Sequence, residues 1–350
     1  MEQTRVVELG NGKAAEAGTL RVSVIIPVLN EEAVIGRCLD ALAQSTLSRK
    51  SLEVLVVDNG STDRTLKVVA GFSERLRLRV LQKAGVNISA LRNLAAAEAR
   101  GEILAFLDAD CLASPEWLER ALAHLDGQSE RIVGSRYAIP ADSSWVGRAW
   151  YGIGHAPVDG DVAYVPSGDL LIRRSTFCQL GGFNEALATS EDCEFCLRAR
   201  NAGLPVRAAV ELAVTHLGTP QTLAQFYRKH RWHGTHVARV FAKNRKSGAH
   251  LRAVAFALYT LGCCGAGLAG LAMALFFRQY ILLIMASSGM IAVSLGCGIR
   301  KLRGVRGREF WSNLLPFTAL YIVYGLARAS ALLAAGRGSR TETPGTGTGL

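Results

Sequence analysis

The sequence lacks three features that would each point to a familiar class of protein. No Gly-x-Gly-x-x-Gly follows the first apolar stretch, which disfavours a dehydrogenase on a dinucleotide-binding fold. Residues 1–20 hold no apolar core of a secretory signal, so we expect a flexible leader and an N-terminal domain that stays in the cytoplasm. The 8 cysteines include one Cys-x-x-Cys pair, Cys193 and Cys196, with no second such pair, which favours reduced thiols over a disulfide framework or a zinc site.

Acidic residues are scarce relative to basic ones, with 29 Asp and Glu against 40 Lys and Arg and a net charge of +11. The basic residues gather at 228–252 and 300–308, and both clusters flank apolar segments. This pattern is typical of cytoplasmic charge that faces anionic lipid beside a membrane helix. It argues against nucleic acid as a partner.

Apolar residues are concentrated in the last third of the chain. Three stretches, 253–277, 280–299 and 310–335, each meet or approach the roughly 20 residues that cross a bilayer. We therefore predict three transmembrane helices, although buried helices of a soluble protein would give a similar pattern. The turn between the first two is so short that they must form a tight hairpin.

The segments around these helices complete the predicted membrane region. Residues 226–252 are predicted to form a basic amphipathic helix in the membrane interface, and 336–350 a disordered tail. The positive charges predict a multi-pass protein of the inner (cytoplasmic) membrane, with its N-terminus inside and its C-terminus outside. Arg328 lies within the third stretch, where a charge is costly, so it should snorkel or face other helices.

The N-terminal part alternates short apolar runs with helical patterns, which predicts an α/β fold with a mostly parallel sheet over residues 21–225. Asn30 is a plausible N-cap for the first helix. Strands are expected at 22–28, 52–57, 78–82, 103–107, 132–137 and 164–172, helices at 33–44, from about 65, at 88–99, 174–180 and 191–201, and a loop at 138–163.

Carboxylates follow two of the predicted parallel strands. Asp58 ends the second strand, and Asp108 and Asp110 follow the strand at 103–107. The C-terminal edge of such a sheet is where ligands bind, and Asp-x-Asp suits a hard divalent cation. The alternative is that these residues cap helices or sit in turns.

Six stretches occur in this order over residues 20–235: Val24-Ile-Ile-Pro-Val-Leu-Asn-Glu-Glu32, Val56-Val-Asp-Asn-Gly-Ser-Thr-Asp63, Ala90-Leu-Arg-Asn93 before Ala99-Arg-Gly101, Phe106-Leu-Asp-Ala-Asp110, Gly181-Gly-Phe-Asn-Glu185 and Glu191-Asp192. Together they resemble the family 2 glycosyltransferases, which have the GT-A fold. The resemblance implies a membrane-anchored, bacterial-type enzyme that transfers a sugar from a nucleoside diphosphate donor, usually with inversion and with Mg²⁺ or Mn²⁺.

The resemblance also implies roles for single residues on the donor side. Asp110 is the expected direct metal ligand and Asp108 the second, while Asp192 is the expected general base that deprotonates the attacking hydroxyl. The remaining donor-side residues are Pro27, Asn30 and Glu31 in the nucleoside pocket, Asp58 as a hydrogen-bond partner of the nucleotide base, and Arg92 near the nucleotide or diphosphate.

Other residues are expected to contact the acceptor or the diphosphate, each with a structural role as the alternative. Glu191 is expected to support Asp192 or to touch the acceptor, Asp169 to contact the acceptor or the donor sugar, and His216 to lie near the metal and the diphosphate. Arg231 and Trp232 resemble part of the Gln-x-x-Arg-Trp motif of processive polysaccharide synthases, but an Arg replaces the Gln.

The function expected from the sequence is transfer of one sugar to a lipid-linked or membrane-proximal acceptor by direct displacement. Such a reaction serves the synthesis of cell envelope polysaccharide or glycolipid. Two alternatives stay open: a processive polysaccharide synthase, and a non-catalytic membrane scaffold that only binds nucleotide.

Overall fold

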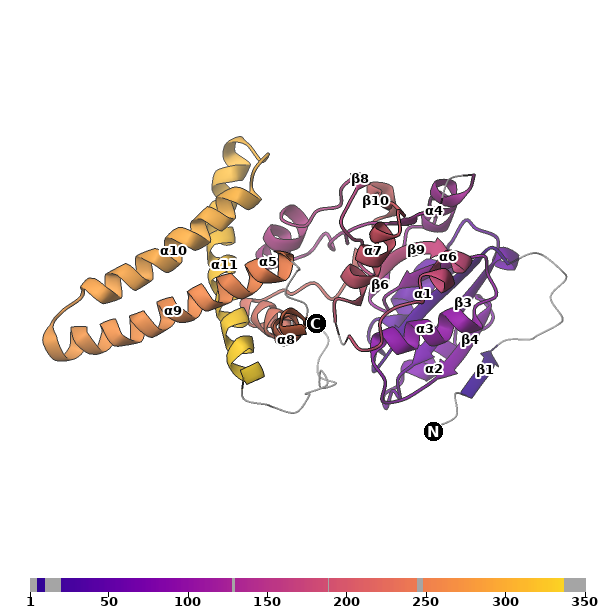
Figure 1. Ribbon diagram of the computed structural model, residues 1–350. Helices are drawn as coiled ribbons and strands as arrows, with labels where there is room; N and C mark the ends of the chain where they lie inside the picture. The colour runs from indigo at the N-terminus through magenta and orange to yellow at the C-terminus, as the bar shows by residue number, and fades with distance from the viewer. Residues whose placement is uncertain (1–4, 10–19, 128–129, 188, 244–247, 337–350) are drawn as a thin grey trace. The chain divides into compact units, whose positions relative to one another are not determined.

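The computed structural model describes residues 5–9, 20–127, 130–187, 189–243 and 248–336 (Figure 1). These residues form two compact units. The first holds the described residues up to Pro140 together with His155–Gly218, and the second holds Ala141–Gly154 together with the described residues from Thr219 onward.

The first unit is built on a nine-stranded mixed sheet with the order β1-β4-β3-β2-β5-β9-β7-β10-β8. The central strands β4, β3, β2 and β5 are parallel, which confirms the predicted α/β fold. The strands are β1 (Arg5–Leu9), β2 (Val22–Val28), β3 (Leu52–Asp58), β4 (Leu78–Gln82), β5 (Ile103–Leu107), β7 (Ile132–Gly134), β8 (Gly160–Asp161), β9 (Asp169–Arg173) and β10 (Val206–Ala208), and a separate pair joins β6 (Cys111–Leu112) to β11 (Thr215–His216).

Helices cover both faces of this sheet, because its central strands are apolar on both sides. Alternate residues of β5 enter two different cores, with Ala105 in one and Phe106 in the other. The first core is completed by α1 (Ile35–Ala43), α2 (Thr65–Ala70) and α4 (Trp117–Leu125), and the second by α3 (Ile88–Glu98), α6 (Arg174–Gln179) and α7 (Glu191–Asn201). The parallel strands β2, β3 and β5 therefore end at one shared edge.

The N-terminal segment differs from its prediction. The sequence predicts a flexible leader over residues 1–20, but Arg5–Leu9 forms β1, antiparallel to β4 at the edge of the sheet. Without β1 the outer backbone groups of β4 would be an open edge, and pairing satisfies them. The other residues of the expected leader, apart from Leu20, lie outside the described part of the chain.

Asn30 does not cap a helix as predicted. The first helix begins at Ile35, and its N-cap residue, Val34, makes no side-chain cap hydrogen bond. Asn30 instead has a left-handed backbone, with φ of 56°, a conformation that Asn tolerates better than most residues. Its Oδ1 accepts a hydrogen bond from the backbone N–H of Thr62 at 2.8 Å. Asn30 therefore ties together the loops that follow β2 and β3.

The segment predicted as a loop at 138–163 contains helical structure. It forms α5 (Trp145–Gly147) and a π-helix (Arg148–Ile153), and both belong to the second unit. The reason is aromatic packing within that unit, because the Trp150 ring lies 5.0 Å from Phe226 and 5.1 Å from Tyr321.

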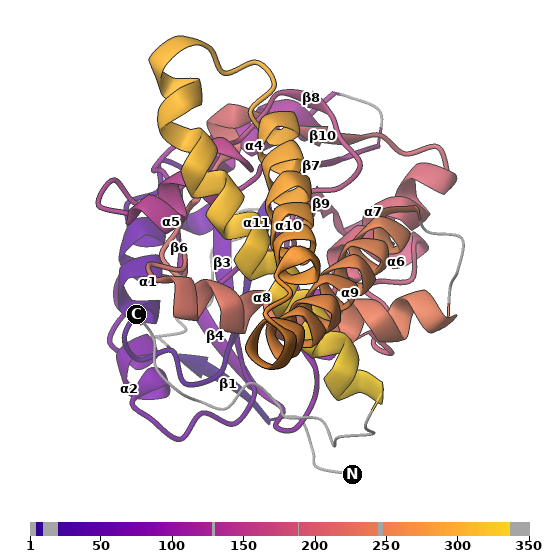
Figure 2. The same ribbon diagram turned by 90° about the vertical axis from the view of Figure 1, so that its left-hand side faces the viewer.

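The second unit contains four long helices: α8 (Leu223–Lys243), α9 (Gly248–Phe277), α10 (Ile281–Lys301) and α11 (Gly307–Gly336). Three of these are long and apolar enough to cross a membrane, over Val254–Phe277, Ile281–Lys301 and Gly307–Ala334. The predicted hairpin is present, since α9 and α10 run side by side (Figures 1 and 2). The tail at 337–350, predicted to be disordered, lies outside the described residues.

The last helix, α11, lies across the base of the hairpin rather than along it (Figures 1 and 2). Tyr324 of α11 contacts Phe256 near the start of α9, with ring centroids 5.9 Å apart. Phe317 of α11 contacts Gly298 near the end of α10. Farther out, the hairpin carries highly exposed apolar side chains: Leu268, Leu275, Phe276, Phe277 and Ile281.

The basic helix α8 packs against α11. The Tyr227 hydroxyl donates to Ser330 Oγ at 2.9 Å, and a Cβ added to Gly234 would lie 2.7 Å from the Cβ of Ala331. The absence of a side chain at Gly234 thus lets the two helices approach closely. The predicted interfacial position of α8 stays a prediction.

Candidate active site

Asp108, directly after β5, is held by two donors. Its Oδ1 accepts a hydrogen bond from Arg92 Nη2 at 2.6 Å, and its Oδ2 accepts one from the Tyr137 hydroxyl at 3.0 Å. Gly168 leaves space for this carboxylate, since a Cβ there would lie 2.1 Å from Oδ2. The first acid of the Asp-x-Asp pair is therefore fixed in place.

Asp110 is about as accessible as Asp108, with 25% of its side chain exposed against 26%. Its Oδ2 lies 3.4 Å from His216 Nε2, because β6 and β11 pair and place His216 opposite Cys111. The His216 ring stacks on Tyr137, with centroids 4.6 Å apart. The structure thus brings together both acids and the histidine that the sequence predicts near the metal.

The donors at this turn fit a hard divalent cation. Ligand atoms of Asp108, Asp110 and Cys111 all lie within 4.8 Å of one another. Burial, and next the charges of the two aspartates, raise the pKa of the Cys111 thiol well above its usual value, so it stays protonated. Carboxylate oxygens are thus the available ligands, and they are the ones that Mg²⁺ and Mn²⁺ prefer.

A third carboxyl group adds to the negative charge. Burial, then the charges of Asp110 and Asp108, raise the pKa of Glu31 to about 7. A proton on Glu31 relieves some of this repulsion, and a bound cation would relieve it as well. The electrostatics of the site therefore favour a cation among these acids.

Arg92 connects Asp108 of the candidate cation site to Glu191 at the start of α7. Its guanidinium is 1% exposed, and its Nη1 donates to Glu191 Oε1 at 2.8 Å while its Nη2 binds Asp108. Ser167 Oγ also donates to Glu191 Oε1, at 2.8 Å. The sequence predicts that Arg92 approaches the nucleotide or diphosphate and that Glu191 supports the base or touches the acceptor. In the structure Arg92 holds two carboxylates, and its approach to the nucleotide or diphosphate stays a prediction.

Asp192 opens α7 next to this network. Its Oδ1 accepts a hydrogen bond from the backbone N–H of Cys193 at 2.7 Å. Burial, and next the charge of Glu191, raise its pKa to about 7. A carboxyl group with a pKa near neutral can accept a proton more readily than an ordinary aspartate, as a general base must.

The predicted nucleoside residues lie on the same sheet edge. Pro27 is buried in β2, and Asp58, also buried, accepts a hydrogen bond at Oδ1 from the backbone N–H of Ser61 at 3.0 Å. Asp58 thus shapes a turn, the alternative that the sequence left open. The nucleotide contacts of these residues, Asn30 and Glu31 stay predictions.

The predicted acceptor residues are more scattered. Asp169 is fully buried in β9, and its Oδ1 accepts a hydrogen bond from Trp117 Nε1 at 3.1 Å. Burial raises its pKa well above the usual range, which favours a structural role over acceptor contact. Arg231 and Trp232 lie on α8 in the second unit, and their roles stay predictions.

The sequence did not reveal several residues that shape the site. Tyr137 and Ser167 bind site carboxylates, and Gly168 and Gly218 leave space for Asp108 and Asp110. None of these belongs to a recognisable local motif. The one signal in the sequence is the position of Gly168, directly before Asp169, which is itself a predicted site residue.

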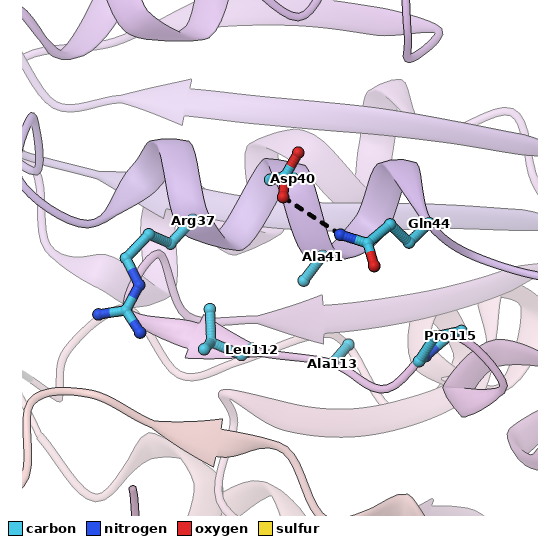
Figure 3. A pocket seen from close by; sticks show the side chains of 7 residues that line it. All are labelled: Arg37, Asp40, Ala41, Gln44, Leu112, Ala113 and Pro115. Carbon is cyan, nitrogen blue, oxygen red and sulfur yellow. Dashed lines mark hydrogen bonds between the residues drawn. The ribbon is translucent and has the colours of Figure 1, made fainter. Parts of the chain in front are cut away.

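A small cavity of about 230 Å³ lies between α1 and the segment after β6 (Figure 3). Asp40 in its lining accepts a hydrogen bond from Gln44. The cavity is lined by Arg37, Asp40, Ala41, Gln44, Leu112, Ala113 and Pro115, so none of the predicted site residues takes part.

Two family models match the chain. The model described as glycosyl transferase family 2 matches residues 23–177, and that of glycosyl transferase family group 2 matches residues 103–326. The second alone covers more than half of the chain and includes helices of the second unit.

Individual proteins agree with these matches. The chain is 30% identical over 206 residues to "Glycosyltransferase AglE" of Haloferax volcanii, covering 57% of this chain and 67% of that protein. It is 31% identical over 233 residues to "Probable glycosyltransferase YdaM" of Bacillus subtilis, covering 61% and 54%. The chain thus spans between half and two thirds of these relatives.

One solved structure shares the fold over most of the chain. It is the mannosyltransferase PcManGT from Pyrobaculum calidifontis in complex with GDP-Man and Mn²⁺. The TM-score is 0.55 at 20% identity, over 92% of this chain and 87% of that one.

Proposed function

Because the chain belongs to glycosyltransferase family 2, we propose that it transfers a single sugar from a nucleoside diphosphate sugar to a lipid-linked or membrane-proximal acceptor. The observation that carries this proposal is the pair of ion bonds by which buried Arg92 connects Asp108 to Glu191, with Asp110 at one end and Asp192 at the other. It joins a candidate cation site to a candidate base.

The proposed reaction is a direct displacement. Asp192 takes the proton from the attacking hydroxyl of the acceptor, whose oxygen forms a bond to the anomeric carbon as the bond from that carbon to the diphosphate breaks. The configuration at the anomeric carbon is inverted. A divalent cation held by Asp110 and Asp108 would neutralise the charge that develops on the leaving diphosphate.

The side chains around the acids prepare this step. Arg92 and Tyr137 keep Asp108 oriented, and Arg92 keeps Glu191 beside Asp192. Fixed orientation lowers the cost of bringing the reacting groups together. The charge of Glu191 also raises the pKa of Asp192, which makes Asp192 the stronger base.

The relatives support the donor class. PcManGT, which shares the fold, is described in complex with GDP-Man and Mn²⁺, a nucleoside diphosphate sugar and a divalent ion. Either Mg²⁺ or Mn²⁺ suits carboxylate ligands.

The long apolar helices of the second unit support the proposal that the acceptor lies in the membrane. Three of them are long and apolar enough to cross a bilayer, and a soluble acceptor would not require them. We propose a multi-pass protein of the inner (cytoplasmic) membrane, with the catalytic domain on the cytoplasmic side.

A panel of nucleotide sugars tests the donor and the metal together. Full-length protein in detergent is heated with UDP-, GDP- and dTDP-linked sugars, with and without Mn²⁺. We expect one nucleotide class to raise the melting temperature only when Mn²⁺ is present, because binding to the folded state stabilises it. Asp110→Asn should lose this shift and Asp161→Asn, at an exposed position in β8, should keep it. A panel without any shift would contradict the proposal.

Product length separates transfer of one sugar from processive synthesis. Membranes that contain the enzyme are incubated with the donor identified above, and the labelled products are separated by size. A single added sugar agrees with the proposal. A ladder of longer products would favour the processive synthase, and donor binding without any product would favour the non-catalytic scaffold.

A further inference from the structure

Arg328 is a cation in an apolar helix with donors left unused. Its Nε and Nη1 atoms are enclosed, and no hydrogen bond or ion pair reaches them from the described part of the chain. The guanidinium lies over the ring of Tyr324, 4.9 Å from its centroid. A ring face attracts a cation but satisfies none of its N–H groups, so these enclosed donors are costly unless an acceptor is supplied.

The second unit has almost no acid to supply that acceptor. From Thr219 to Gly336 the sequence contains one acidic residue, Glu309, and the segment Ala141–Gly154 contains one more, Asp142, which is exposed. Glu309 precedes Arg328 by 19 residues on the same helix (328 − 309), a rise of about 28 Å. The described residues of the second unit therefore offer few carboxylates to Arg328, and an anion from outside the chain would satisfy its enclosed donors.

A second cation lies close to Arg328. Lys229 of α8 has its Nζ 5.4 Å from the centroid of the Tyr151 ring. The charge of Arg328 acts on the same phenol, where it opposes the rise in pKa that burial causes. Helix α8 also touches Arg328 directly, since a Cβ added to Gly234 would lie 3.2 Å from Arg328 Cδ. Lys229 of α8 and Arg328 of α11 thus both lie within electrostatic reach of Tyr151.

Arg328 lies close to the level at which the candidate span of α9 begins. Tyr324, one helical turn before Arg328, packs on Phe256, which is only two residues into the candidate span that starts at Val254. The boundary of an apolar span is where the headgroups of a bilayer begin. Apolar side chains can then face the acyl chains while the two cations face the headgroups.

We propose that Arg328 and Lys229 form a binding site for the phosphate group of a membrane lipid. The guanidinium offers its Nε–H and Nη–H groups as a fork to two phosphate oxygens, and the ammonium adds a second charge. The inference rests on the proposed membrane location but not on sugar transfer, so it can fail while the proposed reaction stands.

Binding of a simple lipid phosphate tests the site without any sugar donor. Full-length protein in a mild non-ionic detergent is titrated with hexadecyl phosphate, with hexadecanol and with inorganic phosphate. Wild-type protein should bind hexadecyl phosphate at least tenfold more tightly than either of the others. Equal affinity for hexadecanol would show that the site does not recognise the phosphate group. Equal affinity for inorganic phosphate would show that it does not recognise the lipid chain. Either result would overturn the proposal.

Variants assign the binding to these side chains. Arg328→Gln should weaken binding of hexadecyl phosphate about tenfold or more, since charge-assisted hydrogen bonds are lost. Arg306→Gln removes one charge from the exposed turn between α10 and α11 and should bind as wild type does. Unchanged binding by Arg328→Gln would overturn the proposal. If Arg328→Gln does not fold, Arg328→Lys and Lys229→Gln replace it, and wild-type affinity in both would overturn it equally.

Discussion

Arg92 and Glu191, 99 residues apart in the chain, form a buried ion pair in which Nη1 lies 2.8 Å from Oε1. The same guanidinium holds Asp108, so one side chain connects the candidate cation site to the start of α7. Burial alone would lower the pKa of this arginine, but the charges of Asp108 and Glu191 raise it, and it stays a cation. Helix α7 and the end of β5 are therefore held in one arrangement.

Replacing Arg92 should destabilise the protein strongly. Arg92→Met leaves two carboxylates without their partner, one of them buried, and breaking a buried pair in this way costs about 3–5 kcal/mol. Unfolding of full-length protein by urea in detergent measures the change. Arg64→Met is the matched control, because Arg64 is mostly exposed (78%) and its pair with Glu32 should contribute little. Equal losses in the two variants would contradict the role given to Arg92.

The rate of transfer should depend on the protonation of Asp192. With its pKa raised to about 7, the base is protonated and inactive below that pH, so kcat/KM should fall about tenfold per pH unit below 7 and level off above it. A pH profile with saturating divalent ion measures this. A flat profile from pH 5 to 8 would contradict the assignment of Asp192 as the base.

The free energy of unfolding should also depend on the protonation of Asp192, and it should fall as the pH rises. Between the ordinary aspartate pKa of 3.8 and about 7 the folded state binds more protons than the unfolded state, so the free energy of unfolding falls as pH rises. Asp192→Asn removes this contribution and should gain stability relative to wild type between pH 5 and 8. Asp161→Asn should show no such relative gain.

Asp169 offers a test between a structural and an acceptor role. Asp169→Asn keeps the hydrogen bond from Trp117 sterically possible, and burial favours the neutral form of this acid, so we expect a change in stability within about 1 kcal/mol. The KM for the acceptor should be unchanged. A large rise in that KM with normal stability would instead restore the acceptor contact that the sequence predicts.

Local sequence patterns were sufficient for most elements of the fold. The strands at 78–82 and 103–107 and the helix at 191–201 occur with the predicted bounds, because apolar runs and an acidic first turn are local signals. The bridge from Arg92 to Glu191 was not predictable, since it depends on how α3 and α7 approach each other. The helical structure of Ala141–Gly154 was not predictable either, because Trp150 packs on Phe226 and Tyr321, which lie far away in the chain.

The side of the membrane that holds the C-terminus can be measured directly. The charge pattern predicts it outside, after three crossings. The contacts of α11 lie at the base of the hairpin, near the start of α9 and the end of α10, and we therefore expect the C-terminus on the same side as the catalytic domain. Alkaline phosphatase fused after residue 350 should be inactive, and phosphatase inserted at the hairpin turn, between Arg278 and Gln279, should be active. An active C-terminal fusion would instead indicate that α11 crosses the membrane as a third span.

Transfer of labelled sugar by the intact enzyme tests the central claim most directly. Membranes with wild-type protein, Asp110→Asn, Asp192→Asn or the control Asp161→Asn are given the nucleoside diphosphate sugar that binds best, with Mn²⁺ or with a chelator, and labelled lipid is extracted. We predict Mn²⁺-dependent labelling with wild type and the control, and a loss of about 100-fold or more in each site variant. Labelling that survives the chelator and both substitutions would contradict metal-assisted transfer at these acids.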